Sequence, residues 1–120
     1  MKLSNEDLRK IAQVKSILEK EYRNNNTHAQ LASRVNTNES KLRKGFKLVN
    51  NKTIYEYLTQ VRIEKAKELL ETTDDPVKAI AFKLGYDVSN LVKQFKKITG
   101  MAPIEWRRKN TPNRSFTFML

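Results

Sequence analysis

Apolar residues recur at helical spacing along most of the chain, and capping residues divide this pattern into segments. A first stripe runs from Leu8 to Leu18 behind a capping start at Ser4. A second stripe follows Thr27, whose hydroxyl is placed to form a capping box with Gln30. The pattern predicts two helices in this part of the chain and a third that ends at the asparagines of 50–51.

The longest periodic segment covers residues 53–72, where Thr53 and Glu56 provide a further capping box. We expect Pro76 at the first position of a fifth helix, since its missing N–H costs nothing there. A sixth helix is predicted from about 89 to 99, and Pro103 opens a seventh. Because the chain has only three glycines and three prolines, little room remains for sheet turns.

An internal repeat with an offset of 49 residues organises the chain. Each copy has a short helix, a bend at Asn36 or Gly85, and a second helix, which is typical of a helix-turn-helix. Within the first copy we expect Leu42, Phe46 and Val49 to face the core. The matched pairs, found without a gap, are Leu31 and Ile80, Ala32 and Ala81, Val35 and Leu84, Ser40 and Ser89, Leu42 and Leu91, Lys44 and Lys93, Phe46 and Phe95, Lys47 and Lys96, and Val49 and Ile98.

These patterns predict an all-α, homeodomain-like fold of seven helices, with two helix-turn-helix subdomains joined by a long connecting helix. The expected division is a first subdomain at 1–52, the connecting helix at 53–72, a second subdomain at 73–110 and a flexible tail at 111–120.

Positive charge is concentrated on the second helix of each repeat copy. The net charge is +11, from 24 lysines and arginines against 13 acids, which favours a polyanionic partner. No acid lies between Glu39 and Glu56, or between Asp87 and Glu105. Both acid-free windows cover a helix that would lie in the major groove of a duplex. The charge pattern therefore predicts contact with double-stranded DNA.

Recognition helices at about 38–50 and 88–99 are expected to enter successive major grooves. Arg43 has the geometry to pair with guanine, and Asn90 or Gln94 with adenine. The predicted base-contacting residues are Ser40, Arg43, Lys44, Ser89, Asn90, Lys93 and Gln94. The predicted phosphate-contacting residues are Thr27, Asn38, Lys41, Lys47, Lys52, Lys96 and Lys97.

Three motifs resemble the DNA-binding domain of the AraC/XylS family of bacterial transcription regulators. They are VRIEKAKELL at 61–70, IA-x-x-LGY at 80–86 and FKK-x-x-G-x-x-P-x-x-x-R at 95–107. The resemblance extends from about Leu8 to Lys109. It implies a two-lobed domain of seven helices, activation or repression of promoters, and contact with RNA polymerase. Carried over by position, the family's reading residues fall near Ser40, Arg43, Lys44, Ser89, Asn90 and Lys93.

Two departures from the family pattern stand out. The spacing from Gly85 to Phe95 is one residue shorter than usual, so base contacts in the second copy are open to a shift by one position. Asn36 stands where the family often has glycine. Most members of the family also carry a sensor or dimerisation domain before this one. The chain is either a short stand-alone regulator or a fragment that lacks such a domain.

Other classes of protein fit the sequence less well. There is no cysteine, His28 is the only histidine, and no phosphate-binding glycine loop is present, so we expect no enzyme, metal site or cofactor. No signal peptide or membrane span is apparent, which predicts a cytoplasmic protein. The alternative is a non-specific architectural or RNA-binding basic protein. Arg62 lies on the apolar face of the connecting helix, and we expect a structural role for it.

Overall fold

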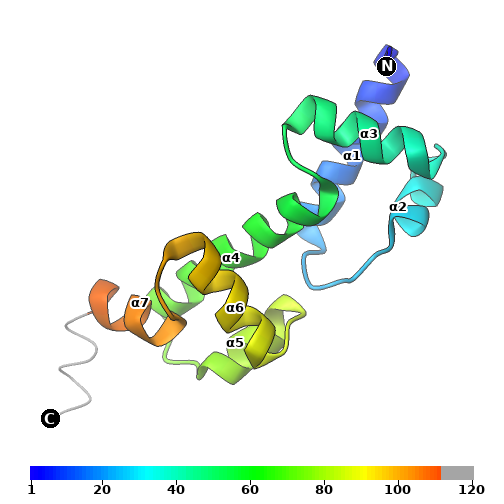
Figure 1. The fold of residues 1–120 in the computed structure, drawn as a ribbon. Helices are drawn as coiled ribbons and strands as arrows, with labels where there is room; N and C mark the ends of the chain where they lie inside the picture. Colours follow the sequence, from blue (N-terminus) through cyan, green and yellow to red (C-terminus); the bar gives the residue numbers. More distant parts are fainter. Residues whose placement is uncertain (112–120) are drawn as a thin grey trace, which may run out of the picture. The chain divides into compact units, whose positions relative to one another are not determined.

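The computed structural model describes residues 1–111, and over this range the α-helix is the only regular secondary structure (Figure 1). The predicted all-α fold is confirmed there. Most of the predicted tail at 111–120 lies outside the described residues. The seven helices are α1 (Asn5–Lys20), α2 (His28–Arg34), α3 (Glu39–Asn50), α4 (Ile54–Thr72), α5 (Val77–Leu84), α6 (Val88–Thr99) and α7 (Pro103–Asn110).

The chain divides into two compact units, and the division falls inside α4. The first unit is Met1–Val61, and the second begins at Arg62. Each unit is described by itself below. The finer division into two subdomains and a separate connecting helix stays a prediction.

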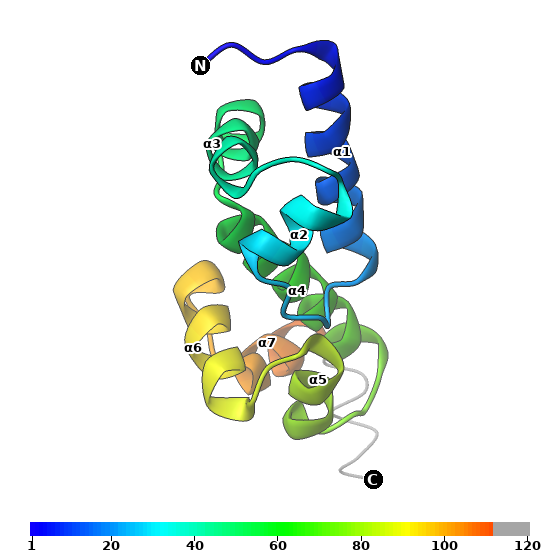
Figure 2. The ribbon, with the colours of Figure 1, turned by 90° about the vertical axis from the view of Figure 1, so that its right-hand side faces the viewer.

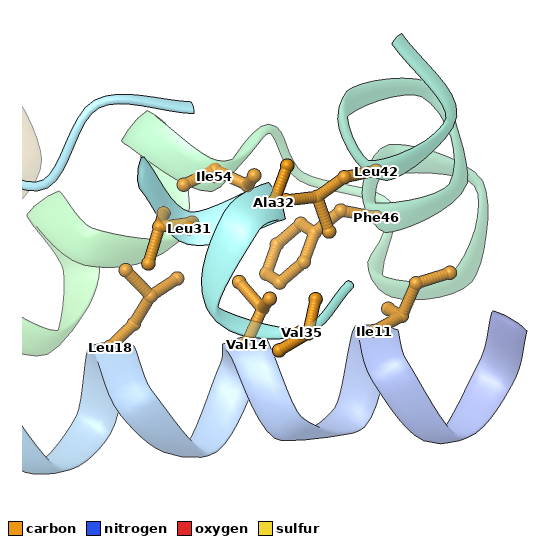
Figure 3. Packing of buried hydrophobic residues seen from close by; sticks show 9 residues of the cluster. All are labelled: Ile11, Val14, Leu18, Leu31, Ala32, Val35, Leu42, Phe46 and Ile54. Atoms are coloured by element: carbon orange, nitrogen blue, oxygen red, sulfur yellow. The ribbon is translucent and has the colours of Figure 1, made fainter. Parts of the chain in front are cut away.

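In the first unit, α3 packs against α1 and α2 around one apolar cluster. Figure 3 shows the ring of Phe46 among side chains from α1 and α2, with Val14 and Leu31 nearby. Both Phe46 and Val14 are fully buried. The expectation that Val49 also faces this core is wrong, since its side chain is 48% exposed. The last turn of α3 does not contribute to the cluster. After Phe46, the next residue of the cluster along the chain is Ile54.

Close packing of α3 on α1 depends on a glycine at position 45. A Cβ atom on Gly45 would lie 2.8 Å from Cδ1 of Ile11, which is shorter than a van der Waals contact allows. The equivalent position in the second repeat copy is Gln94. The two units therefore pack the middle of their second helix differently.

The second unit is held together by α6, which packs against both α5 and α7 (Figure 2). Phe95 is fully buried, and its ring meets that of Trp106 edge to face at 5.7 Å between centroids. Arg107 ties α7 to the end of α4 by donating to the carbonyl oxygens of Leu70 and Thr73 at 3.0 and 3.1 Å.

Arg62 is 4% exposed, and its guanidinium carbon lies 4.8 Å from the centre of the Tyr86 ring. This cation–π contact within the second unit gives the buried Arg62 guanidinium an interaction partner. The predicted structural role of Arg62 is thereby supported by its burial on α4.

The repeat seen in the sequence is matched by a repeat in the backbone structure. Both α3 and α6 have 12 residues, and their ends are offset by the 49 residues of the repeat. The predicted bends at Asn36 and Gly85 are left-handed, with φ of 56° and 81°. Pro76 departs from expectation by one position, because it is the N-cap of α5 rather than its first residue. Its φ of −62° suits either position, and neither needs its N–H.

Candidate nucleic-acid interface

The helices α3 and α6 begin in the same way, with a side chain that caps the first turn. Oδ1 of Asn38 accepts a hydrogen bond from the backbone N–H of Lys41 at 2.7 Å. Oδ1 of Asp87 accepts from the backbone N–H of Asn90 at the same distance. Capping satisfies one of the free N–H groups of a helix terminus and fixes the direction of the helix. The N-terminal turns are thus capped by side chains, and these are the turns expected to meet base edges.

On α3, four predicted DNA-contacting residues form one exposed face. Buried Leu42, Gly45 and Phe46 occupy the opposite face of the helix. The exposed residues are Ser40, Arg43, Lys44 and Lys47. Because the apolar face is fixed against α1 and α2, three cations and a hydroxyl are presented together to solvent.

Lys41 is held apart from this face by an ion pair. Its Nζ lies 3.0 Å from Oδ1 of Asp7, and Lys41 is only partly exposed. The N–H of Ser4 and then the Lys41 ammonium hold the pKa of the Asp7 carboxyl below its ordinary value. A contact between Lys41 and a phosphate requires this pair to open or to be shared, and that contact stays a prediction.

On α6, polar residues alternate with two buried apolar ones. Leu91 and Phe95 are fully buried. The predicted residues Ser89, Asn90, Lys93, Lys96 and Lys97 are all exposed. Gln94 is only partly exposed, so less of its amide is available than the sequence pattern indicated. The amide-bearing residues and the lysines together give α6 an outward face able to donate and accept hydrogen bonds.

Two of the predicted phosphate-contacting residues are also helix caps. The hydroxyl oxygen of Thr27 accepts from the backbone N–H of Gln30 at 3.1 Å, which leaves the hydroxyl proton available for donation. The amide of Asn38 caps α3 through its oxygen and keeps its NH₂ group for a further acceptor. Lys52 is exposed just after the left-handed Asn51 that ends α3. Phosphate contact by these residues is compatible with their bonding in the structure.

A polar hollow at the turn between α2 and α3 adds residues that the sequence did not indicate. Its lining includes the predicted Asn38 and Lys41, together with Lys10 from α1 and Ser33 from α2. Nζ of Lys10 donates to the carbonyl oxygen of Asn36 at 2.7 Å and so supports the left-handed bend. No local pattern relates Lys10 to a residue 26 positions later, so only the fold reveals this contact.

The predicted base contacts thus fall into two sets, each gathered on one helix of one unit. Ser40, Arg43 and Lys44 share α3, whereas Ser89, Asn90 and Lys93 share α6. Within residues 1–111, no three histidine, aspartate or glutamate side chains gather in a way that would hold a metal ion. In the same range, no helix is long and apolar enough to cross a membrane.

Residues 31–109 match the helix-turn-helix domain family. The chain belongs to the AraC type of this family. The match covers about two thirds of the chain and includes all of α3–α6. The resemblance drawn from the three sequence motifs is therefore confirmed.

Individual relatives agree with this assignment. The chain is similar to the Msm operon regulatory protein of Streptococcus mutans, with 30% identity over 82% of the chain and 36% of the relative. The C-terminal domain of AraT, a response regulator from Geobacillus stearothermophilus, matches with a TM-score of 0.82 and 26% identity. That match covers 92% of this chain and 90% of the domain.

A third similarity concerns the fold alone. The DNA-binding domain of AdpA, solved in complex with a target DNA, has a TM-score of 0.79 and 23% identity, over 85% of this chain and 96% of that domain. The chain spans about a quarter to a third of the length of the first curated relatives that it matches.

Proposed function

We propose that this chain binds double-stranded DNA at specific sequences and regulates transcription, with α3 and α6 in successive major grooves. The observation that carries the proposal is the pair of equivalent 12-residue helices, each capped by a side chain and each with an exposed basic face. The family assignment and the regulatory relatives support it. The fold it shares with a domain solved on target DNA adds further support.

The exposed faces of α3 and α6 carry side chains suited to base recognition and others suited to phosphate binding. Arg43 is exposed on α3 and would pair with guanine, while exposed Asn90 on α6 would pair with adenine. Lys47 lies one turn after Arg43 on α3, and Lys96 lies nearly two turns after Asn90 on α6; both would bind phosphate. If about six phosphates are neutralised, affinity should fall by roughly three orders of magnitude between low and moderately raised salt.

Selection of bound duplexes from a random pool tests the proposal directly. We expect an enriched motif of two unlike boxes whose centres are about one helical turn apart. Footprinting of a selected duplex should then protect both boxes on one side of the DNA. Binding without an enriched motif would instead support the non-specific architectural or RNA-binding alternative, and single-stranded RNA should be included as a competitor.

We further propose that the chain works in the cytoplasm as part of a regulator that contacts RNA polymerase. Its relatives include a transcriptional activator and an operon regulatory protein, each several times the length of the matched region, which favours a sensor or dimerisation domain elsewhere in the full protein. Transcription from a promoter that carries the selected motif should change when the chain is added to purified RNA polymerase. The direction of that change distinguishes an activator from a repressor.

A further inference from the structure

Equivalent exposed positions on α3 and α6 can be compared directly because the two helices share their bounds at an offset of 49. Three exposed polar pairs keep their chemistry, namely Ser40 and Ser89, Lys44 and Lys93, and Lys47 and Lys96. The first residue of each helix does not keep its chemistry. It is an exposed glutamate in α3, Glu39, and a valine in α6, Val88, whose side chain is 40% exposed.

Glu39 is the only acidic residue on α3, a helix that carries four cations. Among the described residues its side chain takes part in no ion pair or side-chain hydrogen bond, so its carboxylate is available. A carboxylate close to DNA is repelled by the phosphates unless it accepts a hydrogen bond from a base. One reason to place a glutamate on this helix is therefore a hydrogen bond from a base.

The position of Glu39 supplies that reason. Side chains on a helix lean toward its N-terminus, so the carboxylate of the first residue projects past the end of α3. The N-terminal end of a recognition helix is the part that reaches base edges in the major groove. In that groove the amino group of cytosine is the donor that a carboxylate accepts from.

We propose that Glu39 is a specificity-determining residue that selects a cytosine in the half-site read by the first unit. This inference rests on the proposed function. Val88, its counterpart, has no polar group and would instead contact a thymine methyl group. The two units therefore demand different base pairs at equivalent places, although their backbones repeat.

A simpler role for Glu39 would be to stabilise α3 alone, because a negative charge at a helix N-terminus interacts favourably with the helix dipole. That role predicts a change in folding stability but no change in base preference. The two roles are separated by substitutions that alter the hydrogen-bonding pattern at this position.

The experiment compares base preferences of the full chain and its variants by selection from random duplex pools. Glu39→Val should reduce the preference for cytosine at one position of one half-site by roughly tenfold. Glu39→Gln should move that preference toward adenine, which pairs with an amide. Val88→Glu should create a cytosine preference at the matching position of the other half-site.

Gain of a preference in Val88→Glu cannot result from misfolding, and thermal unfolding of each variant checks that the helices remain formed. The proposal is overturned if Glu39→Val keeps the cytosine preference, or if it tightens binding to every sequence equally. It is also overturned if Val88→Glu gains no preference while it still binds. Failure of the unmodified chain to enrich any motif would instead contradict the proposed function.

Discussion

The two recognition helices of this protein share a backbone but differ in the chemistry that they expose. Their N-caps, lengths and left-handed C-caps correspond one to one. Arg43 of α3, by contrast, is replaced by the partly buried Val92 in α6, and Lys41 by the exposed Asn90. A repeated fold therefore places two different sets of donors and acceptors, which suits an asymmetric site better than two copies of one box.

The units also differ in how each helix is held. In the first unit α3 approaches α1 closely at Gly45, and its basic face is bordered by the ion pair of Lys41 with Asp7. In the second unit α6 is supported by α7 through the contact of Phe95 with Trp106. Each helix is thus held within its own unit by different contacts, and each contact can be removed separately.

The largest effects are expected from removing the buried aromatic ring of each helix. Phe46→Ala and Phe95→Ala should each cost about 3–5 kcal/mol in the free energy of unfolding, since both side chains are fully buried. If each unit reads its own box, Phe46→Ala should weaken binding to one half-site and Phe95→Ala to the other. Chemical denaturation and binding to duplexes with one box scrambled measure both effects. Identical loss on both boxes for each variant would contradict separate reading.

A smaller effect, confined to binding, is expected at Arg43. Arg43→Ala should weaken binding to the selected duplex by about 1–3 kcal/mol and relax specificity in one half-site only. The matched control is Lys52→Ala, a second exposed cation of the first unit, which should weaken specific and random duplexes alike. Titration of both duplexes with both variants makes the comparison. Equal losses on specific and random DNA for Arg43→Ala would exclude base reading by this residue.

Local features of the fold were predictable from the sequence because they depend on residues close together in the chain. The capping boxes at Ser4, Thr27 and Thr53 are all formed, since each needs only a hydroxyl and an acid or amide three residues later. The left-handed bend at Asn36 was predictable for the same reason. Periodicity was sufficient to place Leu42 and Phe46 in the core.

Features that depend on distant residues were not predictable. Val49 satisfies the apolar period of α3, but its exposure depends on where the neighbouring helices end. The contact of Lys10 with the carbonyl of Asn36 joins residues from α1 and the turn after α2. Bidentate pairing of Arg34 with Glu21 likewise leaves no periodic trace in the sequence.

The structure also extends the repeat beyond the part that the sequence revealed. The helices α1, α4 and α7 begin at Asn5, Ile54 and Pro103, which are spaced by the same 49 residues. Capping boxes open α1 and α4, whereas at α7 only the Glu105 carboxylate accepts from the backbone N–H of Ala102. The apolar residues behind these three starts differ too much for an alignment of residue types to show the relationship. The starts of these helices thus keep the spacing of the repeat, although the residue types at and behind them differ.

A further prediction tests the different packing of the two helices at Gly45. Gly45→Ala places a methyl group against Cδ1 of Ile11, and we expect a net loss of about 1 kcal/mol after the gain in helix propensity. Gln94→Ala at the equivalent place should change the free energy of unfolding by less than about 0.5 kcal/mol. Ile11→Val removes the clashing methyl group, so the cost of Gly45→Ala should shrink in that background. The same cost in both backgrounds would show that the contact does not limit the packing.

The smallest effect expected is a difference in acid sensitivity between two equivalent carboxyls, Asp7 in the first turn of α1 and Glu56 in the first turn of α4. Both have a lowered pKa, mainly through a backbone N–H of the capping box, but only that of Asp7 is also lowered by a hydrogen-bonded lysine, Lys41. A carboxyl whose pKa is lowered by folding stabilises the fold at pH values above its pKa in the unfolded chain, which is 3.8 for Asp7. This stabilisation is lost as the pH falls through the lower pKa of the folded chain.

Urea unfolding measured at a series of acidic pH values should therefore show a shallower loss of stability in Asp7→Asn than in the unmodified chain. Lys41→Met should reproduce part of this change, whereas it should leave the contribution of Glu56 unaltered. If Lys41→Met has no effect on the acid dependence, the ion pair does not hold Lys41 in solution. Lys41 would then be free to bind phosphate. The difference between Lys41 and its counterpart Asn90 on α6 would in that case concern only the reading of bases.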